Sequence, residues 1–149
     1  MVVVVIGLAA GLAWARLETD PRALVVREAR TLAAAMEHAA SLAQWRNQAV
    51  AVSASQGVYR FWRREPSLEG DRWLPLVDDD VLSAHALPPG MSAGVVMLAG
   101  APVTGDTLVP LQPSGRNEPY AIEIAADTWR TVLIADPLNR VAISPPSER

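Results

Sequence analysis

The chain begins with an apolar stretch that carries no charge. Residues 1–15 contain no charged side chain, and the first six residues are apolar on every face of a helix. Because such a segment has no polar side to turn toward water, the pattern favours insertion into a membrane or an assembly of helices. As a helix the stretch reaches roughly 22 Å, which is shorter than the roughly 30 Å hydrocarbon core of a bilayer. We predict a shortened membrane-anchor and helix-packing segment formed by Val2, Val3, Val4, Val5, Ile6, Gly7, Leu8, Gly11, Leu12 and Trp14.

Three other interpretations of this stretch stay open. A cleaved secretory signal requires a basic region ahead of the apolar run, and no Arg precedes this run. The consecutive valines suit a buried strand, although the uncharged run is longer than an ordinary strand. A core helix of a soluble domain is the third interpretation. The membrane-inserting helix accounts for more of the pattern than any of these.

A second helix is predicted from residue 21 to about residue 48. Asp20 is a suitable cap, Pro21 is favoured at the first helical position, and the residues that follow contain neither Gly nor Pro. One narrow apolar stripe recurs at spacings of three and four, which is typical of a helix packed against its own domain. We predict that this stripe packs the helix on the head through Val25, Ala29, Leu32, Met36, Ala39 and Ala43.

The rest of the chain, residues 49–149, predicts a β-rich head. Gln56 and Gly57 supply a turn between the first two strands, and residues 120–126 show the clearest alternation of apolar and polar positions. Residues 145–149 have no core pattern and are predicted to be a frayed, disordered tail. The expected strands are residues 49–55, 58–64, 73–77, 93–99, 107–111, 120–126, 129–135 and 140–144.

These elements predict an α+β fold. A long N-terminal helix, kinked near Pro21, packs on a small head of antiparallel strands. The chain then divides into residues 1–48, which hold the anchor and the packing helix, and residues 49–149, which form the head.

Composition and charge narrow the classes of function. The chain has 13 basic and 16 acidic residues and a net charge of −3, so a surface built mainly to bind nucleic acid is not expected. It has no Cys, which excludes a disulfide framework, thiol catalysis and thiolate metal sites.

Few side chains are candidates for catalysis. His38 lies on the polar side of the predicted helix, and neither it nor His85 has a partner at the spacing of metal ligands. Ser83, His85 and Asp80 could in principle form a catalytic triad, but no strand–turn nucleophile elbow supports one. We therefore predict no catalytic residue, no metal site and no cofactor.

Two charged clusters are the remaining candidate binding sites. Asp78, Asp79 and Asp80 could offer oxygen ligands to Ca²⁺, but the Gly and closing Glu of an EF-hand loop are missing, so a solvated loop or helix cap is expected. Four arginines near aromatic residues could stack on and neutralise a single-stranded nucleic acid. Acidic residues interrupt this cluster, which favours a charge-protected edge strand or a protein-docking rim. The arginines are Arg60, Arg63, Arg64 and Arg72.

In the order of its features the sequence resembles type IV pilin-like proteins, and more narrowly the minor pseudopilin H family of the type II secretion system. The Val-rich start leads into residues 6–11 and then into the long Ala-, Arg- and Leu-rich helix. Each motif is weak alone, and their order along most of the chain carries the resemblance. The matching motifs of the head are residues 57–61, 73–76, 109–110, 113–115, 119–124 and 136–141.

The resemblance implies a structural subunit without enzymatic activity. Such a subunit spans the bacterial inner membrane once, with its head in the periplasm, after a prepilin peptidase trims and methylates the full-length precursor. It then joins a short pseudopilus with other major and minor pseudopilins and with inner-membrane components of the secretion system. The H subunit is expected near the tip, where it helps to move folded proteins across the outer membrane. Gly7, Ala10 and Gly11 would let neighbouring helices approach closely.

The sequence departs from the family pattern at three places. Family precursors open with a basic leader, a Gly–Phe cleavage point and a nearby Glu, so we expect the leader and the first mature residues to lie ahead of Met1. The first Pro after the apolar segment is delayed to Pro21. Asn139 stands where relatives often have Gly, and Asn tolerates the left-handed conformation.

Two alternative functions follow from the same features. A minor type IV pilin of the DNA-uptake type would need a cationic surface near the C-terminus, where the chain offers only Arg130, Arg140 and Arg149. A membrane-anchored periplasmic hydrolase would need Ser83 or His85 as a reactive group.

Overall fold

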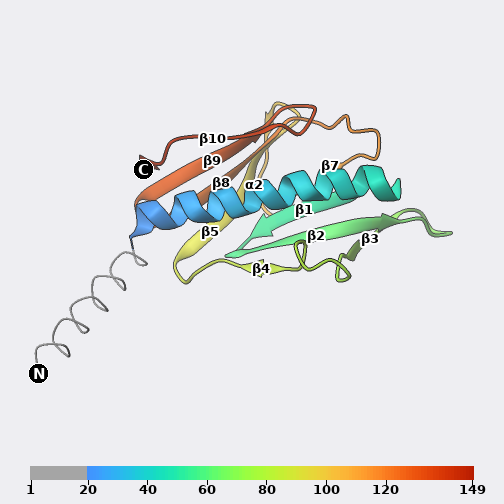
Figure 1. Ribbon diagram of the computed structural model, residues 1–149, viewed down its shortest axis with the longest axis horizontal. Helices are drawn as coiled ribbons and strands as arrows, with labels where there is room; N and C mark the ends of the chain where they lie inside the picture. Colours follow the sequence, from blue (N-terminus) through green and yellow to red (C-terminus); the bar gives the residue numbers. More distant parts are fainter. Residues whose placement is uncertain (1–19) are drawn as a thin grey trace, which may run out of the picture.

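The computed structural model describes residues 20–149, so the predicted anchor segment lies outside the described residues. Helix α2 (Pro21–Arg46) crosses the front of two antiparallel β-sheets, and the C-terminus of the chain returns to the end where α2 begins (Figure 1). The predicted α+β class, with one helix packed on antiparallel strands, is confirmed.

The two sheets contain the predicted strands, with small shifts at their ends. In the first sheet the order is β3-β2-β1-β7, with β4 also paired to β2. In the second the order is β10-β9-β8-β5-β6, with β11 also paired to β9. The strands are β1 (Val50–Ser55), β2 (Val58–Glu65), β3 (Arg72–Pro75), β4 (His85–Ala86), β5 (Met91–Leu98), β6 (Ala101–Pro102), β7 (Val109–Leu111), β8 (Tyr120–Ala126), β9 (Trp129–Ala135), β10 (Val141–Ile143) and β11 (Ser147–Glu148).

The turn between β1 and β2 forms where the sequence predicts it. Ser55 pairs with Val58, and the two residues between them have φ angles of 50° at Gln56 and 78° at Gly57. Two consecutive positive φ angles define a type I′ turn, whose twist matches that of a hairpin. A Cβ at Gly57 would also lie 3.4 Å from the Met91 carbonyl oxygen, so the close approach of β5 adds a second reason for glycine.

The two ends of α2 are fixed by local hydrogen bonds. The side chain of Asp20 accepts a 3.1 Å hydrogen bond from the Arg22 amide, and Asp20 itself is extended, so the helix starts at Pro21. The helix ends at Arg46, two residues before the predicted end, because Asn47 adopts a left-handed conformation with φ of 47°. The predicted kink near Pro21 concerns the junction with residues 1–19, which are outside the described residues.

The prediction of a frayed C-terminal tail is wrong. Ser147 pairs with Arg130, Glu148 pairs with Trp129, and the Arg149 amide donates a 2.7 Å hydrogen bond to the Thr128 carbonyl. Strand β10 covers only the far half of β9, so the near half of this edge has unpaired backbone groups that the tail satisfies. The pattern of apolar core positions does not predict strand β11, because both of its residues are exposed.

Removing residues 147–149 is expected to lower the free energy of unfolding by about 1–2 kcal/mol, because backbone pairing and an ion pair are lost together. The ion pair joins Arg149 Nη2 to Glu123 Oε1 at 2.9 Å. Arg149→Gln keeps the backbone pairing and should cost less than about 1 kcal/mol. Urea unfolding of the two variants separates the contributions, and an unchanged stability of the truncated chain would contradict a role for β11.

Candidate functional site: the helix seam and the strap beside it

The predicted packing stripe of α2 lies at the centre of the protein. All six residues are fully buried, and α2 contacts β8, β9 and β10 of the second sheet as well as β1 of the first. Three of the six are alanines, which hold the helix axis close to the strands, while the larger side chains fill the space between. We call this set the helix seam: Val25, Ala29, Leu32, Met36, Ala39 and Ala43.

The buried face of α2 is wider than the predicted stripe. Because α2 lies against both sheets, Glu28, Ala33, Ala35 and Ala40 are buried as well. Glu28 is the unexpected member, since a carboxylate that is only 5% exposed must find a partner. Its position, three residues after Val25, is a signal that the sequence contains but that the prediction did not use.

Asn139 joins the head to the middle of the helix. Its side-chain oxygen accepts a 2.6 Å hydrogen bond from the Tyr120 hydroxyl, and its amide nitrogen donates a 3.1 Å bond to the Met36 carbonyl. The residue is buried and has a φ of 57°, a conformation that Asn tolerates better than most residues. Burial, with a smaller contribution from the charge of Glu37, raises the pKa of the Tyr120 hydroxyl, which therefore stays a donor.

Asp136 shapes the turn that presents Asn139. Its carboxylate accepts hydrogen bonds from the amides of Leu138 and Arg140, both at 2.9 Å, and from the Arg140 side chain at 2.8 Å. The backbone amide of Arg140 is the main cause that holds the pKa of the Asp136 carboxyl below its ordinary value. The predicted tight connection at residues 136–139 is therefore an Asx-type turn.

The partner of Glu28 is His85, which lies 57 residues away in the sequence. Oε2 of Glu28 lies 2.9 Å from Nε2 of His85, and Oε1 of Glu28 lies 3.9 Å from the Arg27 guanidinium. The His85 ring stacks on Tyr59 with centroids 4.9 Å apart. Burial, helped by the charge of Glu28, raises the pKa of Tyr59 to about 12, so the phenol is neutral at physiological pH.

The segment that carries His85 runs alongside α2 between β3 and β5; we call residues 77–90 the strap. Its first part makes two more ion pairs with the helix. Asp79 Oδ2 lies 2.9 Å from Nε2 of His38, and Asp78 Oδ2 lies 3.2 Å from the Arg46 guanidinium. The hydrogen bond from His38 is the main cause that lowers the pKa of Asp79. Both histidines lie at the boundary of the protein and pair with carboxylates of a distant segment.

The acidic cluster is used within the protein. Asp78 and Asp79 pair with α2, and Asp79 Oδ1 also accepts hydrogen bonds from the amides of Val81 at 2.9 Å and Leu82 at 3.1 Å. The cluster therefore lies in a loop, as one of the two expectations had it, and Asp79 closes a turn there without capping a helix. Within residues 20–149 no group of three or more metal-binding side chains gathers.

The hypothetical triad is not brought together. The hydroxyl of Ser83 donates a 3.2 Å hydrogen bond to the Asp80 carbonyl, while Nε2 of His85 faces Glu28. Ser83 and His85 share no hydrogen bond in the part of the chain that the structure describes, so the observed geometry does not pair this hydroxyl with this imidazole.

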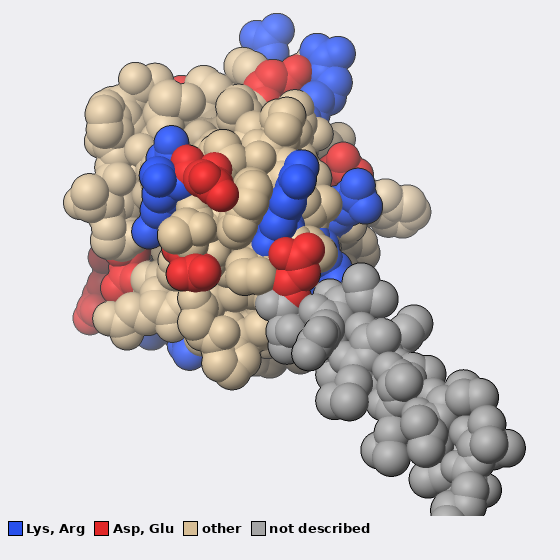
Figure 2. Space-filling model, turned by 90° about the vertical axis from the view of Figure 1, so that its left-hand side faces the viewer, with Lys and Arg blue, Asp and Glu red and all other residues tan. Residues whose placement is uncertain are grey.

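The arginine cluster on β2 and β3 is partly neutralised. Arg63 pairs with Glu65 at 3.1 Å and Arg64 pairs with Asp71 at 3.4 Å. Arg60 lies in an open groove of about 510 Å³ on the outer face of the first sheet, beside Trp62. At the end of the head where α2 begins, basic and acidic side chains are interspersed rather than segregated (Figure 2).

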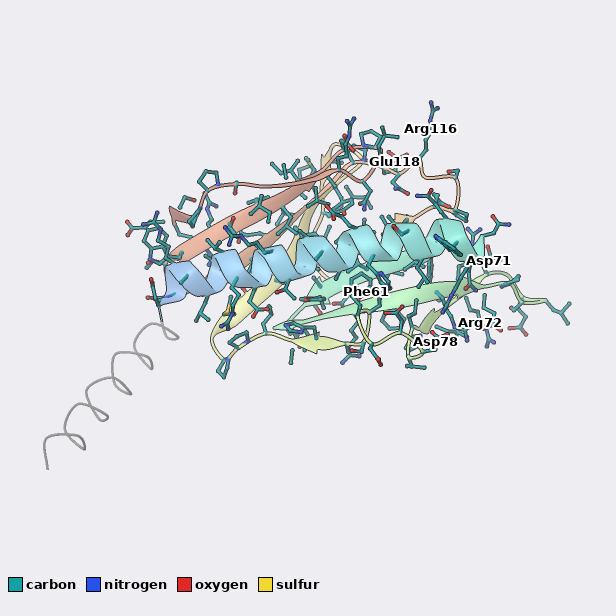
Figure 3. All side chains as sticks on the ribbon, viewed as in Figure 1. Phe61, Asp71, Arg72, Asp78, Arg116 and Glu118 are labelled. Atoms are coloured by element: carbon teal, nitrogen blue, oxygen red, sulfur yellow. The ribbon has the colours of Figure 1, made fainter. Side chains whose placement is uncertain are left out.

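The opposite end of the head, where α2 ends, combines an exposed aromatic side chain with charges. Trp45 in the last turn of α2 is 90% exposed. Asp71, Arg72 and Asp78 lie at this same end, and Phe61 lies deeper, between β2 and the helix (Figure 3). Arg46, the next residue along the helix, pairs with Asp78 at 3.2 Å.

The described helix does not itself reach through a bilayer: in residues 20–149 no helix is both long and apolar enough to cross one.

Comparisons with known proteins agree on one family. The sequence profile described as type II transport protein GspH matches residues 28–144. The fold resembles two solved structures of the minor pseudopilin EpsH from the type II secretion system of Vibrio cholerae. One is 16% identical with a TM-score of 0.64, covering 84% of this chain and 98% of that chain. The other is 14% identical with a TM-score of 0.65, covering 86% and 98%. No curated protein sequence matches the chain significantly.

Proposed function

This chain belongs to the GspH family of type II transport proteins, and on that premise we propose that it is a minor pseudopilin. It joins the tip of a pseudopilus and takes part in the export of folded proteins across the outer membrane. The observation that carries the proposal is the match of the family profile to residues 28–144, which include most of α2 and nearly all of the head. The pairing of His85 with Glu28 and of the Ser83 hydroxyl with the Asp80 carbonyl fits a structural role for these side chains.

We further propose that the chain is anchored in the bacterial inner membrane by one apolar helix, with its head in the periplasm. The support is the sequence of residues 1–15, which lacks any charge. The helix seam starts at Val25, so the packing of α2 on the head does not require the apolar segment. In this scheme a prepilin peptidase processes the full-length precursor before assembly.

The proposed partners are other pseudopilins, together with inner-membrane components of the secretion system. Because the helix seam is occupied by the chain's own head, contacts between heads must use other surfaces. We assign one such contact to Trp45, since a large aromatic side chain that is almost fully exposed gains the most from burial in an interface.

Trp45→Ala in the complete gene is expected to lower cross-linking of the chain to neighbouring pseudopilins by about tenfold, with a parallel loss of secretion. The free energy of unfolding should change by less than about 0.5 kcal/mol, because the side chain is solvated. Val96→Ala, which shortens an exposed side chain of β5, is the control and should leave cross-linking unchanged. Wild-type cross-linking of Trp45→Ala would reject this contact.

Deletion of the whole gene tests the function itself. We expect exported proteins to accumulate in the periplasm, because the pseudopilus would lack a tip component. Normal secretion after deletion would overturn the proposed role. Purified protein that then bound DNA tightly, with an affinity falling steeply as salt rises, would favour the DNA-uptake alternative.

A further inference from the structure

The loop between β2 and β3 carries a leucine that the head leaves in solvent. Leu68 is fully exposed, and Glu69 beside it is exposed as well. The loop is nevertheless held in shape, because the Ser67 hydroxyl donates a 2.6 Å hydrogen bond to the Gly70 carbonyl and the Gly70 amide donates a 3.1 Å bond to the Ser67 carbonyl. A loop that is already ordered loses less entropy on binding. We call residues 66–72 the hairpin tip.

The hairpin tip presents one charge of each sign that is free for a partner. Glu69 and Arg72 are both exposed, and neither forms an ion pair within residues 20–149. Asp71 between them differs, since it pairs with Arg64 at 3.4 Å. Figure 3 shows Asp71 and Arg72 at the end of the head where α2 ends. The tip therefore combines an exposed apolar side chain with a carboxylate and a guanidinium.

A groove of about 510 Å³ lies toward the other end of β2, on the outer face of the first sheet. We call it the β2 groove. Its apolar surface comes from Val58, Trp62 and Leu108, each of which is half-buried. The Trp62 ring is held in place because its Nε1 donates a 2.9 Å hydrogen bond to Oγ of Ser53. Sites that bind ligands commonly measure about 300–1,000 Å³, so the β2 groove can take a side chain the size of leucine.

The β2 groove also holds one charge of each sign. Arg60 and Asp106 line it, and both are exposed. Neither of them forms an ion pair with another residue that the structure describes. The groove thus offers a cation, a carboxylate and an apolar surface, which is the complement of what the hairpin tip presents.

We propose that the hairpin tip of one copy of this chain docks into the β2 groove of a second copy. Leu68 enters the apolar part of the groove. Glu69 meets Arg60, and the second ion pair joins Arg72 to Asp106. The tip and the groove lie at opposite ends of β2, roughly 24 Å apart, so a chain does not fill its own groove. The occupant is a second copy because one chain carries both complementary surfaces.

The contact joins two different surfaces, which makes it heterologous. Every dimer then keeps one free tip and one free groove, so further copies add in a row. Because β2 runs alongside α2 (Figure 1), successive copies are displaced along the length of the helix. A loop in a groove buries less than the roughly 1,200 Å² of a stable complex, so the contact is weak between separate molecules and stronger where copies share one membrane. The part that this contact plays in a pseudopilus rests on the proposed function, but the contact itself is measured without secretion.

Disulfide cross-linking tests the contact directly, since the chain has no Cys of its own. Leu68→Cys and Leu108→Cys are combined in the full chain, which is purified in detergent and treated with a mild oxidant. We expect a ladder of dimers, trimers and longer species on a non-reducing gel, whereas either single variant can give dimers at most. Val58→Cys in place of Leu108→Cys should give the same ladder, because it lines the same groove. The absence of a ladder with both pairs would overturn the proposal.

The matched control moves the second cysteine to the other sheet. Val96 is exposed on β5, outside the β2 groove. Leu68→Cys combined with Val96→Cys is therefore expected to give about tenfold less of the ladder. A ladder of equal strength would mean that the cross-links come from random collisions, and it would reject the docking of the tip in the groove.

A charge exchange tests the ion pair between Arg60 and Glu69. In the chain with cysteines at positions 68 and 108, Arg60→Glu is expected to lower the ladder about tenfold, because two carboxylates would then face each other. Adding Glu69→Arg should restore it, which general damage to the fold cannot do. Both positions are exposed, so the midpoint of urea unfolding should stay at that of the parent chain. A ladder that Arg60→Glu leaves unchanged, or that Glu69→Arg does not restore, would overturn the pairing.

The outcomes for the contact and for the proposed function are separate. A ladder in detergent, together with normal secretion after deletion of the gene, would support the contact and reject the proposed function. No ladder from a chain whose deletion blocks secretion would reject the contact alone. If Leu68→Glu impaired secretion although no ladder formed, the hairpin tip would serve a different partner, and the second copy would be rejected as its occupant.

Discussion

Leu32→Ala is expected to lower the free energy of unfolding by about 2–5 kcal/mol. Leu32 lies in the middle of the helix seam and is fully buried. The change removes buried apolar surface and leaves a cavity between α2 and two sheets, and strands fixed by their own ladders can close such a cavity only in part. Denaturant unfolding of the purified chain, followed by circular dichroism, measures the loss.

Leu68→Ala is the matched control for this variant. The same chemical change is made at a fully exposed leucine in the loop between β2 and β3, where no cavity can form. Its effect should be less than about 0.5 kcal/mol. Similar losses for the two variants would mean that the helix seam does not hold α2 on the head in solution.

Asn139→Ala is expected to cost about 2–4 kcal/mol, because three effects act together. The Tyr120 hydroxyl loses its acceptor inside the protein, the Met36 carbonyl loses a donor, and an alanine must adopt a φ of 57°. Thermal or urea unfolding gives the total. A loss of less than about 1 kcal/mol would show that water replaces Asn139 at the site.

Two companion variants divide this total. Asn139→Gly removes the side-chain hydrogen bonds but relieves the backbone, so it should be about 1 kcal/mol more stable than Asn139→Ala. Tyr120→Phe keeps the backbone and the bond to Met36 while deleting the hydroxyl, and should cost about 1–2 kcal/mol. If Asn139→Gly were no better than Asn139→Ala, the left-handed conformation would contribute little.

Much of the fold was predictable because its signals are local. The apolar stripe of α2, the strand at residues 120–126 and the Gln56–Gly57 turn each depend on a few neighbouring residues, and all three elements form in the structure. The alternation along residues 120–126 does not mark an exposed face, however, because Ala121 and Ala125 are buried as well. Strand ends shifted by one or two residues, and the two-residue strands β4, β6 and β11 were missed. Such short strands exist only because a neighbouring strand has an unpaired edge, which no pattern within two residues can indicate.

The candidate site was less predictable because its contacts join distant segments. His38 and Asp79 are 41 residues apart, His85 and Glu28 are 57 apart, and Asn139 and Met36 are 103 apart. For each histidine the sequence showed only that no partner lies at the spacing of metal ligands. Glu28 lies beside the predicted stripe, between Val25 and Ala29, and only the structure shows that this position is buried.

The sequence alone determined the class of fold, the central stripe of the buried face of α2 and the resemblance to minor pseudopilins, because periodicity and motif order are read directly along the chain. Only the tertiary structure decided which carboxylate each histidine meets, that the tail adds a strand to β9, and that Asn139 links the last turn to the helix. These contacts arise when two sheets and one helix stack, since the spacing between partners is then set by packing in three dimensions and no longer by distance along the chain.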